Sequence, residues 1–151
     1  MKIAIGSDHA GFALKQAVHA ELVRLGHEVV DIGTDSGTES VDYPDYSIPV
    51  GEKVASHEVE RGVVMCATGI GASIAANKVA GVRASVVTSD ETARLTRQDN
   101  DSNVLAMGGK TSATADALRW LNIWLETPFA GGRHERRVNK IRAFEDQHCR
   151  P

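Results

Sequence analysis

The stretch from Val63 to Asn77, V-V-M-C-A-T-G-I-G-A-S-I-A-A-N, restricts the fold of this chain more than any other. Its first four residues are apolar and predict a short buried strand. Gly69 and Gly71 predict a tight turn, because glycine adopts backbone angles that other residues avoid. The residues from Ala72 onward predict the first turns of a helix. A strand, a glycine turn and a helix N-terminus together form a corner that binds anions through free backbone N–H groups.

The same order of strand and helix repeats along the chain. Apolar runs predict five strands, and segments with apolar residues at helical spacing alternate with them. Because parallel strands joined by helices cross over in a right-handed sense, the pattern predicts one α/β domain over residues 1–151, a three-layer α/β/α Rossmann-like fold with a five-stranded parallel sheet. The predicted strands are Lys2–Gly6, Glu28–Ile32, Val63–Cys66, Val82–Val87 and Val104–Met107.

Local signals set the predicted helix ends. A helix over 47–57 is expected to begin at Ser47 as its N-cap, because Pro49 is tolerated in a first turn and not further along. Ser89 is a natural N-cap for a later helix, with acidic residues in its first turn. The other predicted helices run from Gly11 to Leu25 and from Thr111 or Ser112 to Thr127.

Composition excludes several classes of protein. The net charge of −3 creates no basic field for nucleic acid, and no apolar run is long enough to cross a membrane. Two cysteines do not make a disulfide framework, and the N-terminus has no signal peptide, so we expect a cytoplasmic protein. Neither C-x-x-C nor H-E-x-x-H occurs, so no metal site and no cofactor is predicted.

The last segment, residues 131–151, differs from the rest of the chain. Gly131 and Gly132 predict a hinge, and five basic residues follow within ten positions. Val138, Ile141 and Phe144 form a narrow apolar stripe, which indicates a tail helix that docks on another surface. A second subunit is one candidate for that surface.

Five motifs in the same chain resemble the ribose-5-phosphate isomerase B family, which includes galactose-6-phosphate isomerase subunits and allose-6-phosphate isomerases. The resemblance covers nearly the whole chain in the right order, and five motifs together are far more specific than the G-I-G turn alone. The motifs are S-D-H-A-G-F, D-Y-P-D-Y, C-A-T-G-I-G-A-S-I-A-A-N-K, R-Q-D-N-D-S-N-V-L-A-M-G-G and G-G-R-H-E-R-R-V.

Aldose–ketose isomerisation requires a base for the C2 proton, a stabiliser for the enediolate, an acid–base group that opens the sugar ring, and a phosphate site. Cys66 is the candidate base, because a helix N-terminus beside a thiol favours the thiolate, and the resemblance implies a cysteine base at this position. Thr68 and the N–H groups from Gly69 to Ser73 are candidates for holding the enediolate. The structural alternative for Cys66 is a small buried hydrophobic residue at a strand end. The alternative for the glycines is a tight turn that they form for geometry alone.

The resemblance also implies substrate-binding residues elsewhere. Arg133 and Arg137, four positions apart on a helix, suit a phosphate group and would come from the neighbouring subunit. Ala67 stands where the family usually has glycine. The remaining substrate-binding candidates are Asp8, His9, Tyr43, Ile70, Gly71 and Asn100.

Asp99 is the informative departure from the family pattern. Ribose-5-phosphate isomerases of this family carry a histidine there, which opens the furanose ring, and this chain reads R-Q-D-N. A carboxyl group ordinarily titrates near pH 4, which suits an acid at neutral pH poorly. Three residues are candidates for opening the sugar ring: Asp99, His9 and His134. A preference for another sugar phosphate is a further alternative.

The predicted function is metal-independent isomerisation of ribose 5-phosphate to ribulose 5-phosphate, in the pentose phosphate pathway of carbohydrate metabolism. The resemblance implies a homodimer with shared active sites, and it leaves a dimer of dimers open. The alternatives are an isomerase of a six-carbon aldose 6-phosphate (allose or galactose 6-phosphate) and a non-catalytic sugar-phosphate-binding module. A dinucleotide-dependent dehydrogenase is disfavoured, because no G-x-G-x-x-G follows the first strand.

Overall fold

The computed structural model describes residues 1–149 and confirms the predicted α/β fold. Five parallel strands form one sheet in the order β2-β1-β3-β5-β4. The last two residues of the predicted tail segment lie outside the described residues. The strands are β1 (Lys2–Ser7), β2 (Glu28–Asp31), β3 (Arg61–Cys66), β4 (Ala84–Val86) and β5 (Val104–Gly108).

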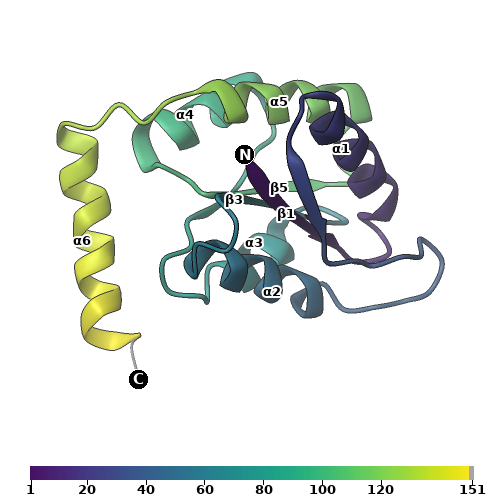
Figure 1. Cartoon of the computed structure of the whole chain (residues 1–151), viewed down its shortest axis with the longest axis horizontal. Coiled ribbons are helices and arrows are strands. Elements are labelled where there is room, and N and C mark those ends of the chain that lie inside the picture. The colour runs from purple at the N-terminus through teal and green to yellow at the C-terminus, as the bar shows by residue number, and fades with distance from the viewer. Residues whose placement is uncertain (150–151) are drawn as a thin grey trace.

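Helices cover both faces of the sheet (Figure 1). The alternation of side chains along β3 separates two core layers: Val63 and Met65 pack under one set of helices, and Val64 and Cys66 under the other. The first layer lies under α1 (Phe12–Arg24), α4 (Asp90–Asn100) and α5 (Thr114–Glu126), and the second under α2 (Pro44–Ala55) and α3 (Ile70–Ala76).

The tail helix α6 (Arg133–His148) stands apart from these layers, beside α4 (Figure 1). Gly131 and Gly132, where a hinge is predicted, have φ values of 67° and 58°, backbone angles that glycine adopts readily. Val138 is buried, whereas Ile141 and Phe144 are exposed. Two of the three residues of the predicted apolar stripe are therefore uncovered in one chain. Along residues 1–149, no helix combines the length and the apolar character needed to cross a membrane.

The predicted start of the second helix was wrong. The helix begins at Pro44, with Tyr43 as its N-cap, and Pro49 lies inside it. Proline suits a first helical position because its missing N–H would be unpaired there in any case. Pro49 is tolerated in the interior because Val50 and Val54 on the same helix pack into the core against β1 and β3.

The start of α5 also differs from the prediction. The helix begins at Thr114 and not at Thr111 or Ser112. The backbone N–H of Ser112 donates to the carbonyl of Gly108 at 3.1 Å, so these residues form a turn after β5. The Ser89 cap of α4 is confirmed, because Ser89 and Thr92 form a reciprocal capping box.

Glu21 ties α1 to α5 and makes stability depend on pH. Its carboxylate accepts hydrogen bonds from Arg24 and from Asn122 of α5, and these lower its pKa to about 2. A carboxyl group whose pKa is lowered on folding stabilises the fold above its ordinary pKa, and this is lost as the pH falls toward 2.

We therefore expect Glu21→Gln to lower the free energy of unfolding at pH 7 by about 1 kcal/mol, an amount reduced by solvent screening of the exposed Arg24 partner. The difference from the unchanged protein should shrink between about pH 4.5 and pH 2, as measured by urea unfolding across that range. Glu126→Gln, an exposed position at the end of α5, is the control. A Glu21→Gln effect that is equally large at pH 7 and pH 2 would contradict this account.

Candidate active site

The connections make the carboxyl ends of β1 and β3 the point at which the strand order reverses. The chain passes from β1 through α1 to β2 on one side, and returns through α2 on the other face to β3. Helices therefore diverge between these two neighbouring strands, which is where open α/β sheets bind ligands. The register pairs Ser7 of β1 with Met65 of β3, so Asp8 and Cys66 follow at the same edge, as predicted.

Cys66 ends β3 at this edge, and its side chain is 4% exposed. The backbone N–H of Gly69 donates a hydrogen bond to its Sγ at 3.2 Å. A thiolate accepts hydrogen bonds of this kind. The turn after β3 is thus arranged around a sulfur atom that can carry negative charge.

Two backbone N–H groups of the turn remain open to a ligand. Gly69 has φ 79°, which a side chain would disfavour. Its own N–H faces Cys66, the N–H of Ile70 donates to Thr68 Oγ1 at 3.2 Å, and the N–H of Ser73 donates to the carbonyl of Gly69. Within the described residues, Gly71 and Ala72 keep their N–H groups without a partner. Of the backbone N–H groups from Gly69 to Ser73 that were predicted to hold the enediolate, only those of Gly71 and Ala72 are therefore unpaired within the described residues.

Ala67 fits the turn without backbone strain. Within residues 1–149, only His57 and Asp101 adopt positive φ among the non-glycine residues. The β-carbon of Ala67 thus sits on an ordinary backbone conformation. Its carbonyl accepts a hydrogen bond from the N–H of Lys110 at 2.9 Å, which ties the turn to the segment after β5.

Asp8 and His9 leave β1 opposite this turn. Asp8 Oδ1 accepts the N–H of Gly11 at 3.0 Å, at the start of α1. His9 Nδ1 accepts the N–H of Val41 at 3.2 Å, so in the neutral ring the proton is on Nε2. Both side chains are therefore held by backbone groups, with one polar atom of each left for a ligand.

Tyr43 completes this group from the start of α2. A β-carbon on Gly71 would lie 2.7 Å from Cζ of Tyr43, so the aromatic ring rests directly on the turn. Tyr43 is 38% exposed. We call the set Asp8, His9, Tyr43, Cys66, Thr68 and the turn residues 69–73 the carboxyl-edge group.

The loops that carry this group touch each other through main-chain atoms, a feature that the sequence analysis missed. A β-carbon on Gly11 would lie 2.7 Å from the carbonyl carbon of Met65, and one on Gly109 would lie 2.5 Å from the carbonyl oxygen of Ala10. A β-carbon on Gly108 would lie 2.8 Å from Cα of Thr68. In the sequence, the pair Gly108-Gly109 directly after the fifth apolar run was the pattern that could have indicated a close approach of two backbone segments.

The other predicted site residues gather at the opposite edge of the sheet. Helix α4 follows β4 and leads back to the beginning of β5, so Asp99 and Asn100 at its end lie where strands begin. His134 Nε2 is 3.4 Å from Asp99 Oδ1. Arg133 and Arg137 flank His134 on α6 and are exposed. We call the set Asp99, Asn100, Arg133, His134 and Arg137 the amino-edge group.

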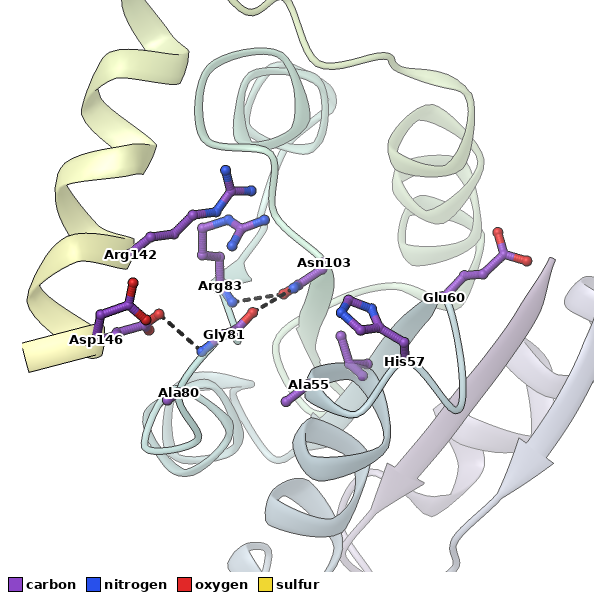
Figure 2. Close-up of a pocket in the computed structure, with 11 residues that line it drawn as sticks. Ala55, His57, Glu60, Ala80, Gly81, Arg83, Asn103, Arg142 and Asp146 are labelled. Carbon is purple, nitrogen blue, oxygen red and sulfur yellow. Dashed lines mark hydrogen bonds between the residues drawn. The ribbon is translucent and has the colours of Figure 1, made fainter. Parts of the chain in front are cut away.

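A cleft of about 460 Å³ lies at this amino edge, between α6 and the segments that precede the strands (Figure 2). Its polar groups largely bind each other. Gly81 donates to Glu145 of α6 at 3.1 Å, and Asn103 bonds with both Gly81 and Arg83. The cleft contains none of the predicted site residues, and these contacts indicate that it anchors α6 to the body of the domain.

The comparisons with known proteins decide the family. A family model described as Ribose/Galactose Isomerase matches residues 3–141. The chain belongs to the ribose/galactose isomerase family. Ribose-5-phosphate isomerase B of Escherichia coli is 47% identical over 146 residues, with 97% of each chain covered.

Solved structures of this isomerase family share the fold over nearly the full chain. Ribose-5-phosphate isomerase B of Clostridium thermocellum has a TM-score of 0.95 and 49% identity, covering 98% of this chain and 99% of that one. The enzyme of Mycoplasma genitalium, with bound ribulose-5-phosphate, has a TM-score of 0.93 and 37% identity, with 97% of each chain covered. The predicted resemblance is therefore confirmed.

Proposed function

We propose that the chain interconverts D-ribose 5-phosphate and D-ribulose 5-phosphate without a metal ion. The observation that carries the proposal is the placement of Cys66 at the end of β3, with an N–H on its sulfur and two unpaired N–H groups in the following turn. Relatives named ribose-5-phosphate isomerase B support the substrate, as does the ribulose-5-phosphate bound to the Mycoplasma genitalium structure.

The proposed reaction uses these groups in sequence. The Cys66 thiolate removes the proton from C2 of the open-chain aldose, and the electrons move toward the C1 carbonyl to form an enediolate. Thr68 and the N–H groups of Gly71 and Ala72 hold the developing oxyanion, because fixed dipoles stabilise charge best where it forms. The proton on O2 passes to O1, the Cys66 thiol returns its proton to C1, and the C2 carbonyl of the ketose forms.

The proposed site is shared between two copies in a homodimer. Within one chain, the carboxyl-edge and amino-edge groups lie at opposite edges of the sheet. One copy can therefore contribute either the base or the arginines to a given site, and not both. Ile70 and Ile74, exposed on α3 beside the turn, support an apolar contact there with a second copy. Arg133 and Arg137 of that copy then hold the phosphate through charge-assisted hydrogen bonds. Two free cysteines support a cytoplasmic setting.

The first test is substrate turnover in the presence of a chelator. We expect ribose 5-phosphate to be converted with a kcat/KM at least about tenfold above that for allose 6-phosphate or galactose 6-phosphate, because an extra carbon misplaces either the phosphate or C2. Ketose formation is followed directly with each sugar phosphate.

The Cys66→Ala variant, purified in parallel, measures any isomerase carried over from the expression host. Turnover of a hexose phosphate alone would move the substrate within the family, as its galactose branch suggests. Tight binding of sugar phosphates without turnover would favour a non-catalytic binding module.

A further inference from the structure

Asp99 and His134 form a side-chain pair across the contact between α4 and α6. Asp99 Oδ1 lies 3.4 Å from His134 Nε2, and the imidazole is only 12% exposed. Within residues 1–149, His134 Nδ1 makes no hydrogen bond, so this nitrogen is available to a ligand. Arg133 on the preceding position and Arg137 one turn away place it beside the proposed phosphate ligands.

The linker before α6 fixes the geometry of this pair. The N–H of Ala130 donates to the carbonyl of Gln98 at 3.0 Å, and Arg97 Nε donates to the carbonyl of Thr127 at 3.3 Å. Gln98 Nε2 also donates to Asp99 Oδ1 at 3.3 Å. The beginning of α6 is thus attached to the end of α4 at several points, and His134 meets Asp99 as a consequence of the fold.

Ribose 5-phosphate requires such a group, because it exists mainly as a furanose ring in which C1 is bonded to O4. Cys66 acts on the carbon-bound proton, so ring opening requires a second proton-transfer residue. Resting on the function proposed above, we propose that His134 is the ring-opening acid and that Asp99 is the residue that positions it. An imidazole exchanges protons near neutral pH more readily than a carboxyl group, whose ordinary pKa is near 4.

The C1–O4 bond breaks, its electron pair goes to O4, and O4 takes the proton from Nδ1 of the His134 imidazolium. The O1 hydroxyl loses its proton to a water molecule as the C1 carbonyl forms, and water then reprotonates the imidazole. The Asp99 carboxylate stays ionised and stabilises the imidazolium, as a carboxylate does in other acid–base pairs.

His9 is the rival acid and is held differently. Its Nδ1 accepts the backbone N–H of Val41, and within the described residues it has no carboxylate partner. It also belongs to the carboxyl-edge group beside Cys66. We therefore assign His9 to binding the substrate and His134 to opening its ring.

The test compares a cyclic and a permanently open substrate. The probe is 4-deoxy-D-ribose 5-phosphate, which lacks O4 and cannot close the furanose ring. We expect His134→Gln to lower kcat for ribose 5-phosphate by about 100-fold and Asp99→Asn by about tenfold. Both variants should turn over the open-chain probe within about threefold of the unchanged enzyme, whereas Cys66→Ala should lose both activities.

A second measurement separates ring opening from a damaged site. With His134→Gln in excess, the rate on ribose 5-phosphate should stop rising with enzyme concentration, because uncatalysed ring opening in solution becomes limiting. Equal losses on both substrates with a rate that stays proportional to enzyme, or full activity of His134→Gln on ribose 5-phosphate, would overturn the assignment. Failure of the unchanged protein on both substrates would instead overturn the proposed function, and this inference with it.

Discussion

Replacing Cys66 by alanine is expected to lower kcat for ribose 5-phosphate by about 10² to 10⁴, the range that general acid–base groups contribute. The turn after β3 would keep its shape, because Gly69 and Thr68 hold it through backbone conformation and the Ile70 N–H. Binding of ribulose 5-phosphate should therefore change by less than about threefold. Steady-state kinetics and calorimetric titration measure the two quantities.

Cys149→Ala is the matched control, because Cys149 is the other free cysteine and is exposed near the end of α6. Its kcat should equal that of the unchanged protein. Alkylation should distinguish the two cysteines in the same way. Loss of activity should track modification of Cys66, and bound substrate should protect Cys66 from modification. A Cys66→Ala variant that keeps more than a tenth of the activity would remove Cys66 from the role of base.

Mixing two inactive variants is expected to restore activity if the site is shared. Cys66→Ala lacks the base, and the double variant Arg133→Ala/Arg137→Ala should lose about 10³ in kcat/KM, because each charge-assisted contact with phosphate is worth about 1.5–3 kcal/mol. When both are co-expressed in equal amounts, half of the dimers are mixed, and each mixed dimer has one intact site of two. The preparation should therefore recover about a quarter of the full activity.

The control for this experiment pairs two variants of the same edge. Cys66→Ala with Asp8→Ala leaves a defect in both sites of every mixed dimer, so no recovery is expected. Analytical ultracentrifugation of the mixed preparations shows that association itself is unaffected. Recovery in neither mixture, with dimers present, would mean that each chain completes its own site.

Much of the fold could be predicted because its signals are local. The strand ending at Cys66, the Gly69 turn and the Ser89 cap each depend on a few consecutive residues, and all three are present. The start of α2 was missed because two prolines lie five positions apart, and only the packing of Val50 and Val54 shows that the helix continues through the second.

The division of the candidate site residues between two edges of the sheet could not be predicted from residue patterns. It depends on the strand order, in which β5 lies between β3 and β4, and on α4 running back to the beginning of β5. The contact between Asp99 and His134 likewise joins residues 35 positions apart through a linker attached to α4. The residue pattern left Asp99 and His134 as alternatives for one role, whereas in the structure they form a pair.

The glycine contacts among the loops after β1, β3 and β5 have a consequence for how substrate preference evolves. Main-chain atoms set the distances from Asp8 to Cys66 and to the turn, and a β-carbon on Gly11, Gly108 or Gly109 would meet backbone atoms. Backbone atoms cannot move aside as a flexible side chain can, so amino-acid substitutions have little means of changing the spacing within the carboxyl-edge group. Adaptation to a longer or shorter sugar phosphate is therefore left to the amino-edge group, of which Asn100, Arg133 and Arg137 are exposed.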